Sequence, residues 1–227
     1  MIPKQLHFVW IGNPLPWWAE KNMEMFRKMN PEYQFRLHDE GVLLKCFEHA
    51  YSRVEGEHLY ARRSDLLRLS ALMRYGGGWY FDCDFLPIRP LDAIYTRYNN
   101  FPRGCFITHC SYLNGRPWIA NGIIGASPGT PFIGAVVTEI LRRAELNPRI
   151  EWPSYGPGVF TPISEQYPQL FHMGDLEDFY RLQKRKDSMA AYRRIADAGY
   201  AREAMEAELG KPLPYMLHQS QMDSLEV

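Results

Sequence analysis

Residues 59–87, LYARRSDLLRLSALMRYGGGWYFDCDFLP, constrain the fold more than any other part of this sequence. The first part is rich in Leu, Ala and Arg, which favour a helix, and three glycines then end it. An aromatic strand follows and closes on Asp82 and Asp84. Phosphate-binding glycine loops run from a strand into a helix. Because the order here is reversed, we predict that Gly76, Gly77 and Gly78 serve as a helix stop.

The opening of the chain predicts an α/β domain. QLHFVWIG at 5–12 is a short apolar run closed by turn residues, residues 16–29 carry apolar side chains at helical spacing, and YQFRLHD at 33–39 alternates as a second strand. This β-α-β order favours a central, mostly parallel sheet flanked by helices.

The rest of the chain continues the pattern and becomes helical towards its C-terminal end. We predict a helix at 42–51, a strand at 79–88, strands at 105–113 and 117–127, a helix at 131–146, a rigid Gly/Pro loop at 155–163, and a basic helical region from 181. The length of 227 residues fits one core, so we treat residues 1–227 as a single domain.

Charge and hydropathy exclude some classes of protein. Lys plus Arg and Asp plus Glu both total 26, so no net charge attracts the protein to nucleic acid or to an anionic membrane. No apolar stretch reaches the length of a transmembrane helix, and MIPKQLHFVWIG lacks the apolar core of a signal peptide. We expect a cytoplasmic protein without a transmembrane segment or a nucleic-acid partner, and peripheral contact with a membrane stays open.

The two aspartates are the strongest chemical signal. Along a strand, Asp82 and Asp84 point to one face and Cys83 to the other, so two like charges repel. Either the strand end leaves them solvated, or a proton, a cationic side chain or a metal compensates them. The surrounding aromatic residues argue for burial, and strand ends of open α/β sheets form ligand crevices. Mn²⁺ or Mg²⁺ accepts such carboxylates together with phosphate oxygens, which suits nucleotide-sugar transfer and nucleotidyl transfer equally.

Three stretches together resemble a known family: HFVWIG at 7–12, the block at 61–92, and IANGIIGASPGTPF at 119–132. The chain resembles the DXD-containing glycosyltransferases of the sugar-binding-region type, the family 32 group of Och1-like and capsular polysaccharide transferases, and more remotely the catalytic domain of clostridial glucosylating toxins. The resemblance implies a GT-A fold, a divalent cation, a nucleotide-sugar donor that is UDP-linked by analogy, and transfer with retention of configuration. It divides the domain into a donor- and metal-binding part, 1–132, and an acceptor side with a C-terminal lid, 133–227.

The resemblance also assigns roles to the two aspartates and to Trp10. Asp84 corresponds to the direct metal ligand, and Asp82 to its partner that reaches the donor ribose and metal-bound water. Trp10 corresponds to the aromatic residue that stacks on the base; a core tryptophan is the alternative.

Further residues of the donor site follow from the same resemblance. Asp65 and Arg68 share a helix face and correspond to contacts with the donor sugar, ribose and phosphates, where the alternative is a plain intrahelical ion pair. Tyr80 is expected to line the donor site or to pack in the core. Asn121 corresponds to a position near the transferred sugar, with a turn before Gly122 as the alternative.

The C-terminal end departs from the family pattern. Family members often close with a histidine followed by Ser-Trp, and this chain has His218 and Ser224 with Leu225 in place of the tryptophan. His218 and Ser224 are therefore candidate further metal or phosphate ligands, against a frayed tail. The substitution puts the lid contact in doubt.

The resemblance implies a metal-dependent, retaining glycosyltransferase of polysaccharide biosynthesis that transfers a hexose or N-acetylhexosamine to a glycan, a lipid-linked oligosaccharide or a protein. No residue can be named as a nucleophile, so a covalent intermediate and same-face attack both stay open. Two other functions remain, a metal-dependent nucleotidyltransferase and a non-catalytic carbohydrate-binding module. The first usually has Gly-Ser before its paired aspartates, and the second would not need the carboxylate pair.

Overall fold

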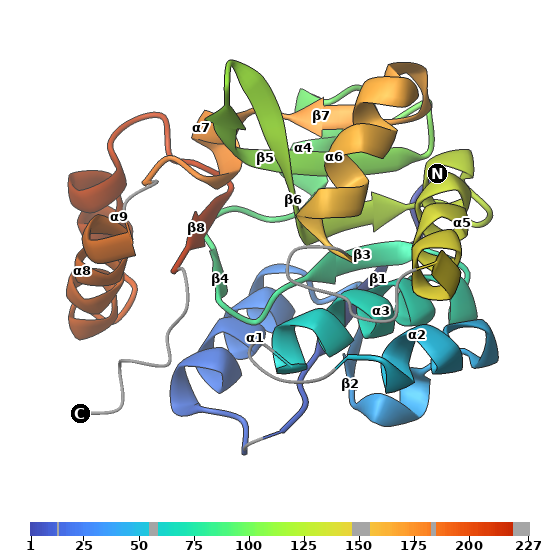
Figure 1. Ribbon diagram of the computed structural model, residues 1–227. Helices are drawn as coiled ribbons and strands as arrows, with labels where there is room; N and C mark the ends of the chain where they lie inside the picture. The colour runs from blue at the N-terminus through green and yellow to red at the C-terminus, as the bar shows by residue number, and fades with distance from the viewer. Residues whose placement is uncertain (13, 55–58, 147–154, 183–184, 220–227) are drawn as a thin grey trace.

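The computed structural model describes residues 1–12, 14–54, 59–146, 155–182 and 185–219 (Figure 1). Its strands are Gln5–Val9 (β1), Gln34–His38 (β2), Gly78–Phe81 (β3), Phe85–Pro87 (β4), Cys105–Leu113 (β5), Arg116–Ala126 (β6), His172–Gly174 (β7) and Met216–His218 (β8). Its α-helices are Trp17–Met29 (α1), Glu48–Ser52 (α2), Leu59–Arg74 (α3), Asp92–Arg97 (α4), Pro131–Leu146 (α5), Pro157–Gln166 (α6), Leu176–Phe179 (α7), Arg185–Asp197 (α8) and Arg202–Leu209 (α9).

A six-stranded sheet in the order β2-β1-β3-β6-β5-β7 forms the centre, and β4 and β8 form a separate two-stranded ribbon. The β1–β2, β1–β3 and β5–β7 pairs are parallel, whereas β3–β6 and β5–β6 are antiparallel. The predicted, mostly parallel sheet is confirmed, with β6 as its antiparallel strand. Because β1, β2 and β3 run in one direction, their carboxyl ends meet at one edge of the sheet, where ligands bind in open α/β folds.

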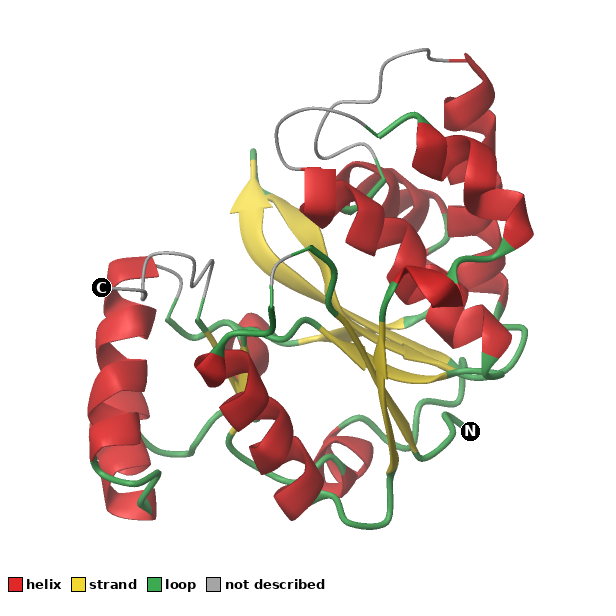
Figure 2. Cartoon of the chain, turned by 90° about the horizontal axis from the view of Figure 1, so that it is seen from below, coloured by secondary structure: helices red, strands yellow, loops and turns green. Residues whose placement is uncertain are grey.

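Alternation along the central strands sends side chains into two cores, one on each face. Phe8 and Phe81 pack into a core with α1, α4 and the C-terminal helices, whereas Val9 and Tyr80 pack against α2, α3, α5 and α6. Helices therefore cover both faces of the sheet, as Figures 1 and 2 show, and α8 and α9 lie beside the β4–β8 ribbon. None of the described helices is both long enough and apolar enough to cross a bilayer.

The glycines after α3 end that helix as predicted. Gly76 and Gly77 have φ angles of 72° and 94°, and the Gly77 amide donates to the Leu72 carbonyl over 2.7 Å. This left-handed turn suits glycine because it lacks a Cβ atom. Gly78 then begins β3 directly, so the glycine run connects the strongest predicted helix to the strand that leads to the aspartates.

Two local predictions are wrong. The helix expected at 42–51 is divided into 3₁₀ turns at Glu40–Val42 and Lys45–Phe47 and the short α2. The loop expected at 155–163 contains the start of α6, with Pro157 at its first turn, where no amide donor is required. Pro162 lies inside α6, and the Gly158 carbonyl that lacks its helical donor accepts from Arg143 Nη1 over 3.0 Å.

The strand expected at 79–88 is also divided. Residues 82–84 form a turn between β3 and β4, in which the Phe85 amide donates to the Asp82 carbonyl over 3.3 Å. Asp82 and Asp84 therefore lie in a turn, and their predicted placement on one face of a strand is wrong. Cys83 is still turned away from them, since it is buried and its Sγ lies 3.5 Å from the Val9 carbonyl.

Candidate active site

The turn of residues 82–84 lies at the carboxyl edge of the sheet and is held from several sides. The Asp82 amide donates to the Gly122 carbonyl over 2.8 Å, and the Cys83 carbonyl accepts from Asn22 Nδ2 of α1 over 2.9 Å. Gly122 on β6 leaves the room that Asp82 needs, because a Cβ atom there would lie 2.7 Å from Asp82 Oδ2. The Gly122 carbonyl of β6 and the Asn22 side chain of α1 thus fix the backbone of the turn next to the end of β1.

Arg68 on α3 connects the acidic residues. Its Nη2 lies 3.2 Å from both Asp65 Oδ1 and Asp82 Oδ1, and Nη1 donates to the Asn121 carbonyl over 2.6 Å. Asn121 Nδ2 in turn donates to Asp65 Oδ1 over 2.7 Å. Tyr80 contributes from β3, since its hydroxyl donates to Asp82 Oδ1 over 2.6 Å and its ring lies 4.8 Å from the guanidinium. One cation with only 4% of its surface exposed thereby compensates two carboxylates.

Burial dominates the electrostatics of this network. It raises the pKa of Asp65 to about 6, against the opposing effects of Arg68 and Asn121. Burial also raises the pKa of Asp82, with a further contribution from the charge of nearby Asp84. For Arg68, burial opposes the charge, but the carboxylates and Tyr80 outweigh it and raise the pKa. The site therefore concentrates negative charge in a desolvated place, which a cationic ligand would relieve.

Asp84, the second aspartate of the turn, lies beside the short strand β8. β8 pairs antiparallel with β4, which places Phe85 opposite His218, and the Gln219 amide donates to the Asp84 carbonyl over 2.9 Å. His218 Nε2 lies 3.2 Å from Asp84 Oδ2. Burial disfavours the imidazolium, yet Asp84 and Asp82 raise the pKa of His218 overall. Ser224 lies outside the described residues.

Trp10 lies beside a cavity at the same edge of the sheet. It follows β1 directly, is half-buried, and stands edge-on to Trp18 with the ring centroids 5.9 Å apart. Together with Tyr60 and Arg63 of α3 and residues 39–41 after β2, it lines a cavity of about 630 Å³, which we call the Trp10 cavity. A planar base could stack there. The Cys83–Val9 contact links this strand end to the acidic turn.

The structure thus brings Trp10, Asp65, Arg68, Tyr80, Asp82, Asp84, Asn121 and His218 to one edge of the sheet. Tyr80 is buried beneath Asp82, with only 1% of its surface exposed, so it contacts the acidic network and not the open cavity.

Comparison with known proteins bears on this arrangement. Residues 17–101 match the model of the family described as "Glycosyltransferase sugar-binding region containing DXD motif". This part of the chain is similar to the DXD-type glycosyltransferase sugar-binding region, and we call it the sugar-binding region. The match spans α1, α3 and the acidic turn, and it confirms the family resemblance seen in the sequence.

Solved glycosyltransferases share the fold of the sugar-binding region and of most of the remaining chain. The PaToxG glycosyltransferase aligns with a TM-score of 0.56 at 20% identity, over 93% of this chain and 79% of that one. A glycosyltransferase involved in glycosylation of the major capsid of PBCV-1 gives 0.55 at 13%, over 96% and 95%. The ligand-free glycosyltransferase domain of the YGT toxin gives 0.53 at 11%, over 91% and 90%. These likenesses show the predicted GT-A fold; no curated protein matches.

The donor set of the sugar-binding region fits a hard divalent cation. Within the described ranges no three His, Cys, Asp or Glu side chains form a closed metal site. A Mn²⁺ or Mg²⁺ ion that works with phosphates needs only one or two protein carboxylates, because phosphate and water fill the remaining positions. Asp84 and Asp82 supply such carboxylates. A cation bound between them would relieve the repulsion by which the charge of Asp84 raises the pKa of Asp82.

Several residues in and around the sugar-binding region contact the site but were not predicted from the sequence. Asn22 of α1 donates to Gln219, which follows β8, over 3.0 Å. Both residues also hydrogen-bond to the backbone of the acidic turn, Asn22 at Cys83 and Gln219 at Asp84. Tyr180 packs edge-on against Phe85, and burial together with both aspartates raises its pKa. Gly156 precedes α6 and leaves room for the Asp65 side chain, because a Cβ atom at this position would lie only 2.8 Å from Asp65 Oδ2. Isolated polar residues of this kind carry no local sequence signal.

Proposed function

We propose that this protein is a metal-dependent, retaining glycosyltransferase that uses a nucleotide sugar, by family analogy UDP-linked. The transferred group is a hexose or N-acetylhexosamine, and the acceptor is a glycan, a lipid-linked oligosaccharide or a protein. We further propose a cytoplasmic role in polysaccharide biosynthesis. The observation that carries the proposal is the buried Arg68 bridge between Asp65 and Asp82, beside Asp84 and next to the Trp10 cavity.

The base, the diphosphate and the sugar of a nucleotide sugar can each be assigned to a different place at this edge of the sheet. The base fits the Trp10 cavity by stacking on the indole, and the diphosphate then reaches the acidic turn, where Asp84 with Asp82 would hold Mn²⁺ or Mg²⁺. His218 lies beside Asp84 and is a further candidate ligand of the metal or the phosphates. Ser224 is the remaining candidate ligand. The sugar is left near Asp65 and Asn121, whose side chains already bond each other.

The bound cation supplies positive charge against the leaving diphosphate. The chain's own residues prepare for that charge. Arg68 keeps Asp82 oriented and ionised, and the Tyr80 hydroxyl fixes the same oxygen of Asp82. Their rigid geometry costs no reorganisation during the reaction, which is how preorganised polar groups lower a barrier. The acceptor hydroxyl then attacks the anomeric carbon as the carbon–oxygen bond to the diphosphate breaks, and its proton passes to the diphosphate oxygen.

The direct test measures release of nucleoside diphosphate from a panel of UDP- and GDP-sugars, with Mn²⁺ and with chelator. We expect release only with the metal and its loss in Asp84→Asn by about a hundredfold or more, the scale of removing one strong electrostatic contact. Asp187→Asn, on the exposed face of α8, is the matched control and retains activity. Full activity of Asp84→Asn would contradict the assigned metal role.

The same assay separates the two alternatives. A nucleotidyltransferase would form a nucleotide-linked product and release pyrophosphate from a nucleoside triphosphate, and a carbohydrate-binding module would release neither product. Thermal unfolding with UDP and Mn²⁺, together and apart, gives an independent measure of donor binding, because a ligand that binds only the folded state raises the Tm.

A further inference from the structure

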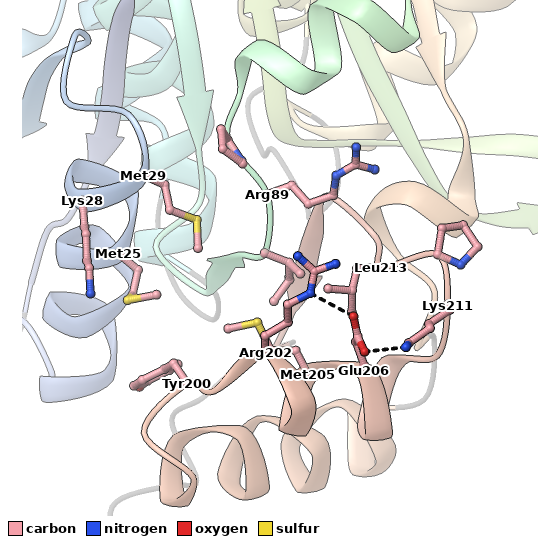
Figure 3. Close-up of a pocket in the computed structure, with 13 residues that line it drawn as sticks. Met25, Lys28, Met29, Arg89, Tyr200, Arg202, Met205, Glu206, Lys211 and Leu213 are labelled. Carbon is pink, nitrogen blue, oxygen red and sulfur yellow. Dashed lines mark hydrogen bonds and ion pairs between the residues drawn. The ribbon is translucent and has the colours of Figure 1, made fainter.

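A second cavity lies away from the acidic turn, between α1 and the C-terminal helix α9. Its volume is about 780 Å³, and its walls come from α1, from residues 88–90 after β4, and from residues 200–213 (Figure 3). Ile88 is four residues beyond Asp84 along the β4 ribbon, which corresponds to about 13 Å at the rise of a strand. The cavity is thus separate from the donor site.

The walls of this cavity are unusually rich in methionine. Met25 and Met29 reach into it from α1 and Met205 from α9, as Figure 3 shows, and Ile88 and Leu213 complete an apolar lining. Methionine side chains are flexible and polarisable, so they adapt to an apolar chain of undefined shape. An apolar lining of this kind fits a hydrocarbon segment of a ligand better than a free sugar.

The charged residues of the cavity are almost all basic. Lys28, Arg89, Arg202 and Lys211 line it, and Glu206 is its one acidic residue. Glu206 accepts from Arg202 over 2.9 Å and from Lys211 over 2.7 Å (Figure 3). Four cations against one anion give a local formal charge of +3, whereas the whole chain has a net charge of zero. The excess is therefore a property of this place and not of the composition.

Two of these cations are not used in ion pairs of the described chain. Among the described residues, neither Lys28 nor Arg89 forms a close ion pair. Lys21 and, more weakly, the charge of Lys28 nevertheless lower the pKa of Glu24, which lies one turn earlier on α1. Arg89 stacks over the Tyr215 ring with its guanidinium 4.3 Å from the ring centroid. The ring restricts Arg89, which lowers the entropy lost when it binds an anion. Arginine and lysine beside an apolar surface suit phosphate, through charge-assisted hydrogen bonds.

We propose that this cavity binds a single-chain phosphorylated amphiphile, with the phosphate on the basic residues and the hydrocarbon chain on the methionines. The occupant is a monomer and not a bilayer surface, because the ligand must enter a recess between two helices. The site is independent of the proposed transferase activity. It assigns a role to the side of the molecule where α9 faces α1.

The probe for this site is decyl phosphate below its critical micelle concentration, titrated by calorimetry into the whole protein. We expect saturable binding at one site, with affinity rising about twofold to fourfold per methylene from hexyl to decyl phosphate. Inorganic phosphate should bind far more weakly, and decyl maltoside should show no comparable affinity. Equal binding of inorganic phosphate or of the maltoside would overturn the proposal, as would binding to phosphatidic-acid vesicles without binding of the monomer.

Variants place the ligand within the molecule. Lys28→Gln with Arg89→Gln should weaken decyl phosphate binding about tenfold or more, because the two cations that form no close ion pair with a described residue are lost. Lys45→Gln with Arg116→Gln, at exposed positions outside the cavity, is the matched control. Asp84→Asn should bind decyl phosphate normally, which separates this site from the donor site. Unchanged affinity in the Lys28/Arg89 variant would show that the ligand does not lie here.

Discussion

A buried pair of histidines predicts a steep loss of stability in mild acid. His7 in β1 is fully buried and His38 at the end of β2 nearly so, and His7 Nδ1 lies 2.9 Å from His38 Nε2. His7 Nε2 faces the Gly77 carbonyl at 3.2 Å, so it must donate, which makes Nδ1 the acceptor and His38 Nε2 the donor between the rings. If His7 Nδ1 took up a proton, two N–H groups, His7 Nδ1 and His38 Nε2, would face each other and the hydrogen bond between the rings would be lost.

The magnitude follows from the pKa values. Burial lowers the pKa of each histidine from 6.5 to about 4, with added repulsion from His38 on His7 and from Arg36 on both. Because the folded state holds the proton less tightly, each contribution is complete above pH 6.5 and is lost as the pH falls from there to about 4. For one histidine this amounts to about 2 kcal/mol between pH 7 and pH 5, and about 3 kcal/mol in the acid limit.

The assay is urea unfolding at pH 7 and pH 5 of the wild type and of His38→Gln, whose amide can still donate to His7. Carboxylates with raised pKa values, such as Asp65, act in the opposite direction, so the quantity to compare is the change between the two pH values in each protein. We expect this change to be about 2 kcal/mol smaller in the variant, because one titrating group is removed. His49→Gln, at an exposed position of α2, is the control. Equal changes in wild type and His38→Gln would refute the reasoning.

Three further predictions concern the acidic network. Arg68→Met should lower the free energy of unfolding by about 3 to 5 kcal/mol, because Asp65 would stay buried, and Asp82 partly buried, without their cation; urea titration measures it. The kcat/KM for the donor should fall as the pH drops through about 6, where Asp65 takes up a proton and its ion pair with Arg68 weakens; a pH profile of Asp65→Asn that keeps this limb would contradict it. Gly122→Ala should displace Asp82 through a 2.7 Å approach to Oδ2 and reduce Mn²⁺-dependent donor turnover more than Gly134→Ala, where a Cβ atom meets nothing within 4 Å.

Local sequence signals were sufficient for the elements that position most of the candidate site. Leu, Ala and Arg across residues 59–74 with a glycine stop identified α3, and α3 carries both Asp65 and Arg68. The apolar run at 5–9 identified β1 and so placed Trp10 at a strand end. The Gly/Pro content of residues 155–163 was misleading, because the helix there depends on Arg143, which satisfies the Gly158 carbonyl opposite Pro162. A bond between α5 and α6 has no signature in either segment alone.

The geometry of the acidic turn depends on contacts that sequence periodicity does not encode. The pair in D-C-D is recognisable in one line of sequence, yet its placement follows from Asn22 on α1, Gly122 on β6 and His218 on β8. β8 has only three residues and pairs with β4 across more than a hundred positions, so neither alternation nor length could indicate it. The distinction matters for function: the sequence motif supplies the carboxylates, but the β4–β8 pairing sets His218 against Asp84. A shift of one residue in that pairing would turn His218 to the opposite face of the ribbon, away from Asp84.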